Sequence, residues 1–227
     1  MKIAVLKETY PSERRVALVP ASIPALAKAG LEVLVEQGAG QAAGLADDQY
    51  TSKGGRIVTD RNELFRADLL LQVRTFGANR QVGRADLERL TAQSAVIGTC
   101  DPLGAPDAVR EMAQTGASVF ALEMIPRITR AQSMDVLSSQ ATIAGYRAVL
   151  VAATELPKMF PMLMTAAGTL AAARVFIVGA GVAGLQAIAT ARRLGAIVQA
   201  YDVRAATREQ VESLGGKFVE LKLETGQ

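Results

Sequence analysis

Short apolar runs alternate with helical patterns along the first half of the chain. Six runs rich in aliphatic and β-branched residues predict strands, at Ile3–Leu6, Glu32–Glu36, Arg56–Val58, Leu69–Val73, Val96–Thr99 and Val119–Leu122. Helices are predicted between them, for example over Ala21–Ala29 and Ala105–Thr115, and a glycine follows each of these two. Because strands that alternate with helices are typical of βαβ units, the pattern predicts an α/β fold with a parallel sheet.

The pattern changes after Met124. The stretch from Met124 to Ser138 is polar and predicts a loop, and Ser139–Leu156 then predicts one long helix. Pro157 and Pro161 end this helix, because proline cannot continue the backbone hydrogen bonding. We expect the helix to join two α/β domains, with the boundary near residue 140.

The strongest motif follows this helix, in the stretch RVFIVGAGVAGLQ. An apolar strand over Arg174–Val178 precedes the pattern G-x-G-x-x-G, and a helix over Leu185–Leu194 follows it. In a dinucleotide site the first glycine allows a tight turn, the second lets the backbone approach a pyrophosphate, and the third lets helix and strand touch. The helix N-terminus then offers unpaired N–H groups to the phosphates. The residues expected to hold the cofactor here are Gly179, Ala180, Gly181, Val182, Ala183 and Gly184.

An acidic residue stands where such a site needs one. A second strand, Ile197–Tyr201, ends at Asp202, 18 residues after Gly184. A carboxylate there accepts both ribose hydroxyls and repels a 2′-phosphate, which favours NAD over NADP. Val203 and Arg204 complete the expected cofactor-binding residues, although Arg204 is close enough to offer a 2′-phosphate a partner. The alternative is a simple strand-to-helix turn with Asp202 as a helix cap; strand, glycines, helix and acid together favour the nucleotide site.

Little of a dinucleotide domain follows Asp202. A helix over Ala206–Leu214 and a strand over Lys217–Leu221 precede the last residue, whereas a dinucleotide site uses two βαβ halves. We therefore expect an N-terminal α/β domain over 1–138, a bridging helix over 139–160 and the first half of a Rossmann domain over 161–227. The other half is expected on another chain, or in a longer protein of which this is a fragment.

A polar cluster lies in the loop RITRAQSMDVLSSQ, between the last strand of the first domain and the long helix. It contains Arg127, Arg130, Gln132, Asp135 and Ser138. Such a loop would open onto an interdomain cleft. From spacing alone, the favoured interpretation is a solvated loop in which Asp135 or Ser138 caps the helix.

Composition narrows the class of protein. The chain has 227 residues, with 25 Lys+Arg against 22 Asp+Glu scattered along it, so a nucleic-acid partner is not expected. The single cysteine, Cys100, gives no sign of an oxidising compartment and is most simply a small buried residue. The N-terminal run is too short for a signal peptide, and the weakly polar stretch Phe160–Ala173 is too short to span a bilayer. A cytoplasmic protein without a membrane span is therefore expected.

The stretches RITRAQSMDVLSSQATIAGYRAV and DVRAATREQVESLGGKF, the glycine motif, and KETYPSERRVALVP near the start carry a resemblance to a known family. They resemble the NAD(H)-binding alpha component of the proton-translocating nicotinamide nucleotide transhydrogenases, which are related to alanine dehydrogenase. The resemblance runs from end to end and implies two Rossmann-like, doubly wound parallel-sheet domains joined by a long helix. It also implies that the chain continues well past Gln227, so that the second domain is incomplete at its C-terminus.

The resemblance implies an activity. In a Re/Si-specific, proton-translocating NAD(P)+ transhydrogenase, hydride passes between NAD(H) on this component and NADP(H) on a partner, and the component alone need not be active. Arg127, Gln132, Asp135 and Ser138 match the family's polar loop, which orients the nicotinamide. Hydride transfer between two nicotinamides needs apposed rings and no general base. The chain has no histidine, and no acid–base residue and no metal are expected.

The resemblance also implies partners. These are an NADP-binding component, a membrane proton-channel component and a second copy of this chain in a homodimer. The chain itself would be soluble and would lie at the cytoplasmic face of the membrane through its partners.

Two other functions stay open. Alanine dehydrogenases resemble the chain's start, with Arg15 in the place of an arginine that binds the substrate carboxylate. The stretches that match their essential lysine and histidine contain Gln72 and Arg74, and Cys100 and Asp101, instead, which argues against that activity. Arg15 is then better interpreted as a surface or cleft-lining residue. The missing half of the site also allows a non-catalytic NAD-binding module.

Overall fold

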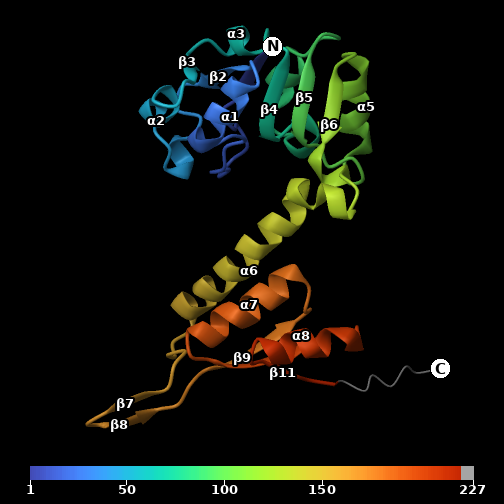
Figure 1. Cartoon of the computed structure of the whole chain (residues 1–227). Helices are drawn as coiled ribbons and strands as arrows, with labels where there is room; N and C mark the ends of the chain where they lie inside the picture. The colour runs from blue at the N-terminus through green and yellow to red at the C-terminus, as the bar shows by residue number, and fades with distance from the viewer. Residues whose placement is uncertain (221–227) are drawn as a thin grey trace, which may run out of the picture. The chain divides into compact units, whose positions relative to one another are not determined.

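A computed structural model describes residues 1–220. The chain forms two compact units, Met1–Asp135 and Val136–Gln227, called here the first and the second unit. Figure 1 shows the elements of both units.

The first unit is built on a parallel sheet. Its strands are β1 (Lys2–Val5), β2 (Glu32–Glu36), β3 (Arg56–Val58), β4 (Leu69–Arg74), β5 (Ala95–Thr99) and β6 (Ser118–Ala121). They lie in the order β3-β2-β1-β4-β5-β6, and every paired neighbour is parallel (Figure 1). This order, 3-2-1-4-5-6, is that of a doubly wound Rossmann sheet, so the predicted fold class is confirmed.

The central strands of this sheet contribute to hydrophobic clusters on both faces, since successive side chains of a strand point to opposite faces. Ala4, Leu34 and Leu70 belong to one hydrophobic cluster, and Val5 and Val35 to another. The near-continuous apolar runs of these strands thus reflect burial on both faces.

Helical segments of the unit are η1 (Pro20–Ser22), α1 (Ile23–Lys28), η2 (Gln41–Ala43), α2 (Asp47–Thr51), α3 (Arg61–Leu64), η3 (Phe76–Ala78), α4 (Arg84–Leu87), α5 (Pro106–Gln114), η4 (Leu122–Met124) and η5 (Thr129–Met134).

The second unit begins with the long helix. Its elements are α6 (Val136–Glu155), β7 (Leu163–Thr165), β8 (Gly168–Leu170), β9 (Arg174–Val178), α7 (Val182–Arg193), β10 (Ile197–Tyr201), η6 (Ala205–Thr207), α8 (Arg208–Ser213) and β11 (Lys217–Phe218). Strands β9, β10 and β11 form a parallel sheet in the order β11-β10-β9, and β7 and β8 form an antiparallel hairpin (Figure 1). The three parallel strands correspond to strands 3, 2 and 1 of a Rossmann sheet.

Helices α6 and α7 pack tightly against each other. A Cβ placed on Gly145 of α6 would lie 2.1 Å from the backbone oxygen of Ala183 in α7. Glycine therefore lets the two helix backbones approach. Val149 of α6, Ile188 of α7 and Val198 of β10 belong to the hydrophobic core of the unit.

Several predicted boundaries differ from the structure. The predicted helix Ala21–Ala29 is a 3-10 turn followed by a short α1, with Pro24 in the first turn of α1. The long helix begins at Val136, three residues before its predicted start, so Ser138 lies inside α6. The predicted loop at 124–138 contains the 3-10 helix η5, and the weakly polar stretch after α6 contains the hairpin β7–β8, which the sequence analysis missed. The predicted strand Lys217–Leu221 ends at Phe218, and Leu221 lies outside the described residues.

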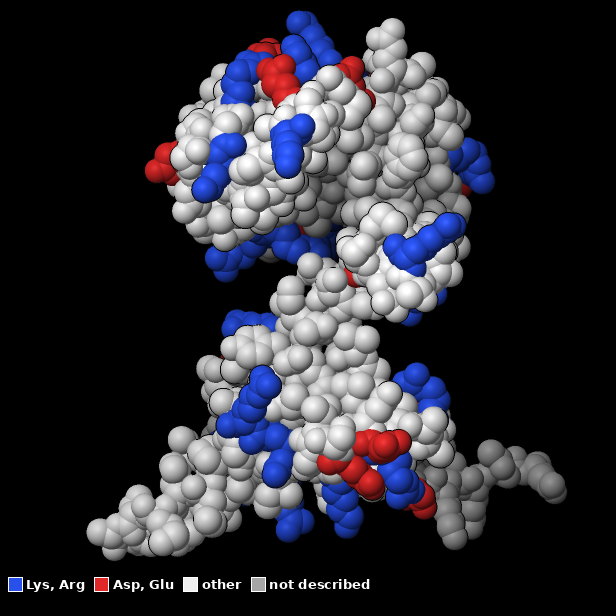
Figure 2. Space-filling view, viewed as in Figure 1, with Lys and Arg blue, Asp and Glu red and all other residues white. Residues whose placement is uncertain are grey.

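Within residues 1–220, α6 is long and apolar enough to cross a membrane by length and composition, and little of it is buried. In the sequence, only the later stretch Phe160–Ala173 was weighed as a possible membrane span. One such helix is weak evidence for a membrane span. Charged side chains of both signs are scattered over the face of the molecule in view in Figure 2.

Candidate functional site

The glycine motif forms the turn between β9 and α7. Gly179 has φ +94°, a conformation that residues with a Cβ rarely adopt. A Cβ on Gly184 would lie 1.7 Å from the Gly179 backbone oxygen, so the start of α7 rests directly on the turn. A Cβ on Gly181 would meet no atom within 4 Å. Gly181 therefore leaves open space beside the backbone.

The N-terminus of α7 faces outward from this turn without a side-chain cap. Helix α7 begins at Val182 with Gly181 at the N-cap position, and no side chain caps it. The N–H groups of Val182, Ala183 and Gly184 precede the first intrahelical donor, which is Leu185 bonded to the Gly181 oxygen at 2.8 Å. Such an end attracts anions through these N–H groups and the helix dipole.

Asp202 ties the glycine turn to the second strand. It follows β10 directly, and its side chain is 5% exposed. Its Oδ2 accepts the backbone N–H of Ala180 at 2.7 Å, and its carboxylate also accepts hydrogen bonds from the Arg204 side chain at 3.0 Å. Hydrogen bonds from the Arg204 side chain, and then from the backbone of Arg204 and Ala180, hold the pKa of Asp202 well below its usual range. Asp202 is therefore an anion beside the glycine turn.

The polar loop lies at the end of the first unit. Arg127, Arg130 and Gln132 are exposed, and Asp135 is half-buried directly before α6. Ser138 is half-buried on the first turn of α6, in the second unit. The structure thus brings Asp202 to the glycine turn. The residues of the polar loop belong to both units, because the division between the units falls after Asp135 and Ser138 lies in the second unit. The roles of these loop residues stay predictions.

Glu8 is a half-buried acid that was not singled out from the sequence. It follows β1, and its two carboxylate oxygens accept the backbone N–H groups of Val73, at 2.6 Å, and Arg74, at 3.1 Å, near the end of β4. Strands β1 and β4 mark the point where the strand order reverses, which is where ligands of such sheets bind. In the first unit, the backbone N–H groups of Val73 and Arg74 at this point are already bonded to the Glu8 side chain. An acid just after a buried strand was the signal available in the sequence.

Burial raises the pKa of Glu8 from its ordinary value of 4.5 to about 7, although the hydrogen bonds from Val73 and Arg74 oppose the shift. The folded state therefore binds this proton more tightly than the unfolded state. The resulting stabilisation is fully present below pH 4.5 and is lost as the pH rises through 7.

In the variant Glu8→Gln, which has no titrating group at this position, the free energy of unfolding is expected to depend less on pH over this range. Wild-type protein should lose up to about 3 kcal/mol between pH 4.5 and pH 7.5 from this group, and the variant should lose little. Urea unfolding followed by circular dichroism at several pH values measures both curves. Glu13 does not interfere, because hydrogen bonds from Arg15 lower its pKa to about 2, so it titrates below this window. Parallel curves for the two proteins would contradict the assignment.

Arg15 and Arg74 share one carboxylate. Arg15 donates to Glu13 from Nε at 2.8 Å and from Nη2 at 2.7 Å, and Arg74 Nε donates to Glu13 at 2.9 Å. Arg15 lines a pocket of about 290 Å³ together with Lys7, Glu8 and Glu13. Glu13 thus neutralises the positive charge with which Arg15 would bind a substrate carboxylate. Arg15 lines a cleft, and Cys100 is 2% exposed in the core, as the sequence analysis expected.

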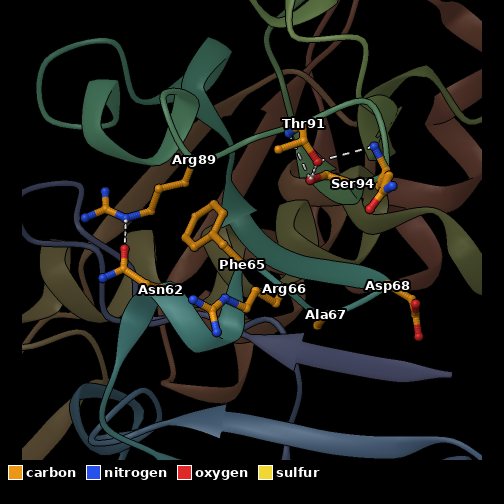
Figure 3. A pocket seen from close by; sticks show the side chains of 9 residues that line it. Asn62, Phe65, Arg66, Ala67, Asp68, Arg89, Thr91 and Ser94 are labelled. Atoms are coloured by element: carbon orange, nitrogen blue, oxygen red, sulfur yellow. Dashed lines mark hydrogen bonds between the residues drawn. The ribbon is translucent and has the colours of Figure 1, made fainter.

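Another cavity, of about 400 Å³, lies at the other end of the strands of the first sheet. Phe65, Arg66, Arg89 and Ser94 are among its lining residues (Figure 3). Arg89 donates to Asn62 at 2.9 Å, and its guanidinium lies 5.9 Å from the centre of the Phe65 ring. Ser94 directly precedes β5, so the cavity lies by the amino ends of strands. Because ligands of open α/β sheets bind beyond the carboxyl ends, it is not a candidate for the nucleotide site.

Comparison with known families decides the relationship. Residues 4–144 match the family described as "Alanine dehydrogenase/PNT, N-terminal domain", and residues 148–227 match "Alanine dehydrogenase/PNT, C-terminal domain". The chain belongs to the alanine dehydrogenase/PNT family. The resemblance seen in the sequence is therefore confirmed.

Within the alanine dehydrogenase/PNT family, the chain is similar to transhydrogenase subunits. It is 48% identical over 220 residues to an NAD(P) transhydrogenase subunit alpha protein of Rhodospirillum rubrum, a match that covers 96% of this chain and 57% of that protein. The crystal structure of transhydrogenase from Sinorhizobium meliloti matches with a TM-score of 0.91 and 48% identity, over 97% of this chain and 64% of that one. The chain thus spans a little over half the length of the curated Rhodospirillum rubrum relative.

Alanine dehydrogenases of the same family are more distant. The enzyme of Halomonas elongata is 31% identical over 206 residues, which cover 89% of this chain and 53% of that protein. The identity is lower than the 48% shared with the transhydrogenase subunit. The similarity therefore favours the transhydrogenase branch of the alanine dehydrogenase/PNT family.

Proposed function

We propose that this chain is the NAD(H)-binding component of a proton-translocating transhydrogenase. The observation that supports it best is the contact between Asp202 and Ala180, which places a carboxylate beside the uncapped N-terminus of α7. This arrangement suits a dinucleotide, with its pyrophosphate at the helix end and its adenosine ribose at the acid. Residues 161–227 would form the first half of the NAD-binding domain, connected by α6 to the N-terminal domain.

The chain's own residues would bind and orient, without moving a proton. When bound, NAD(H) supplies or accepts the hydride. Gly179 to Gly184 would hold the pyrophosphate through backbone N–H groups, and Asp202, with Val203 and Arg204 beside it, would hold the ribose. Arg127, Gln132, Asp135 and Ser138 would fix the nicotinamide, because hydride transfer depends on bringing the ring carbon within reach of its acceptor. No general base is required.

The proposal includes partners. NADP(H) would be bound by a separate component, a membrane component would carry the protons, and two copies of this chain would form a dimer. The chain would lie at the cytoplasmic face of the membrane through these partners. The word "subunit" in the name of the Rhodospirillum rubrum relative supports the existence of partner subunits.

Titration of the purified chain with NADH and with NADPH, followed by nucleotide fluorescence, tests the site. Saturable binding of NADH and much weaker binding of NADPH are expected. Hydride transfer is then measured after adding an NADP-binding component, NADPH and an NAD analogue whose reduced form absorbs at a distinct wavelength. Binding of NADH without any transfer would support a non-catalytic module instead. Binding of neither nucleotide by this chain would contradict the proposal that it carries a working site.

Alanine dehydrogenase activity is the second candidate, because of the family and because Arg15 lines a pocket. The hydrogen bonds that Arg15 and Arg74 donate to Glu13 argue against this activity, because they neutralise the charge that would bind a substrate carboxylate. Steady oxidation of NADH with pyruvate and ammonia would reverse this ranking.

A further inference from the structure

Asp202 and Arg204 form a closed pair at the end of β10. Oδ1 of Asp202 accepts the backbone N–H of Arg204 at 2.8 Å and its Nε at 3.0 Å. Oδ2 accepts Nη2 of Arg204 at 3.0 Å and the backbone N–H of Ala180 at 2.7 Å. The acidic side chain is 5% exposed and the basic one 61%. The anion is thus buried beneath the cation that pairs with it.

This pairing uses the whole accepting capacity of the carboxylate. A carboxylate has about four lone-pair sites, and Asp202 accepts four hydrogen bonds. Two of them come from the backbone and hold the turn in place. The two from the Arg204 side chain are the ones that ribose hydroxyls can replace, because that side chain is largely exposed and can move. Arg204 therefore covers the ribose position of the proposed site.

Arg204 also has the chemistry for a different ligand. A guanidinium offers a planar fork of N–H donors that matches the oxygens of a phosphate, and an arginine near this position accommodates the 2′-phosphate in NADP-binding Rossmann domains. In this chain, Nε and Nη2 are directed at Asp202 and their charge is compensated. A 2′-phosphate would in addition lie beside the Asp202 anion. Both effects have their origin in one carboxylate.

We propose that Asp202, besides accepting the ribose hydroxyls as the acid of such sites does, also selects the nucleotide by holding Arg204 away from a 2′-phosphate. Arg204 is then a specificity-determining residue, and neutralising Asp202 releases it to bind 2′-phosphorylated nucleotides. This inference rests on the proposed nucleotide site. It concerns only the adenosine half of that site, so it is testable without the nicotinamide.

The test uses ADP-ribose and 2′-phospho-ADP-ribose as probes, with binding measured by calorimetry. The variants are Asp202→Asn, Arg204→Gln and the double variant. Asparagine removes the charge but keeps an oxygen that can accept the Ala180 N–H. The wild-type chain should prefer ADP-ribose. In Asp202→Asn, binding of the 2′-phosphorylated probe should strengthen at least about tenfold, the effect of one charge-assisted hydrogen bond.

The double variant decides whether Arg204 is responsible. The gain should disappear in Asp202→Asn with Arg204→Gln, and Arg204→Gln alone should show no gain in affinity for the 2′-phosphorylated probe. Asp202→Ser is the second neutral variant, should asparagine disturb the turn, and urea unfolding verifies that each protein is folded.

The two proposals fail in different ways. If folded wild-type protein binds no ADP-ribose, the nucleotide site of the proposed function is wrong and this inference with it. If ADP-ribose binds but neither neutral variant gains affinity for the 2′-phosphorylated probe, the inference alone is overturned. A gain that persists in the double variant also overturns it, because another group would then hold the phosphate.

Discussion

Replacing Gly184 with alanine is expected to abolish NADH binding and to destabilise the second unit. The new methyl group would lie 1.7 Å from the backbone oxygen of Gly179, and a backbone atom cannot turn aside as a flexible side chain does. Helix α7 would have to move away from the turn. Overpacking of this kind costs about 3 kcal/mol or more, and it displaces the N–H groups at the helix end. Urea unfolding and NADH fluorescence titration measure the two effects.

Gly181→Ala is the matched control. A Cβ at Gly181 meets no atom within 4 Å, and the residue's φ of −80° suits alanine. Stability should be unchanged, while NADH binding should weaken about tenfold or more because the methyl group lies where the pyrophosphate approaches. If Gly184→Ala unfolds like the wild type, the contact between helix and turn is less strict than the geometry indicates. If Gly181→Ala binds NADH normally, the pyrophosphate does not lie against this turn.

Replacing Arg61 with methionine is expected to destabilise the first unit strongly. Arg61 donates to Asp86 from Nε at 2.9 Å and from Nη2 at 2.7 Å, and it also pairs with Glu36. The exposed fractions of the Arg61, Glu36 and Asp86 side chains are 18%, 14% and 10%. Methionine would leave two largely buried carboxylates without a counter-charge. Loss of one partner of a buried pair costs about 3 kcal/mol or more, which thermal and urea unfolding will detect.

Two further variants separate charge from shape. Arg56→Met removes an arginine that pairs with Glu32 and Glu63 at the surface, where both sides are about half exposed, and it should leave the unfolding midpoint unchanged. Adding Asp86→Asn to Arg61→Met should restore part of the lost stability, because it removes one of the stranded charges. Equal losses of stability in Arg61→Met and Arg56→Met would show that the ion pairs of Arg61 contribute no more than a surface ion pair.

The strand positions followed closely from the sequence because each strand is a short run rich in aliphatic and β-branched residues. Glu32–Glu36, Arg56–Val58, Arg174–Val178 and Ile197–Tyr201 are strands with the predicted bounds. The glycine turn was predictable for a similar reason, since its backbone geometry admits few other residues at Gly179 and Gly184. Local rules of burial and sterics determine these features.

Contacts between distant or neighbouring polar groups did not follow from the sequence. Glu8 accepts hydrogen bonds from residues more than 60 positions away, which no local pattern encodes. The sequence placed Arg204 near Asp202, but it could not show that the two side chains pair. The hairpin β7–β8 was missed because its strands have only three residues each and are exposed, so they lack the alternation that marks a half-buried strand.

The place of β1 in the first sheet has a consequence for how the chain acquires its structure. This strand is synthesised before both of its neighbours in the sheet, since Ile3 pairs with Val33 on one side and with Leu69 on the other. The strand cannot gain its second neighbour until β4 has left the ribosome. Pairings so far apart in sequence form slowly, because the intervening chain must be ordered before the contacts stabilise it. Folding of the first unit should therefore be limited by the docking of β4 against β1, and the apolar side chains of β1 will stay accessible to chaperones until then.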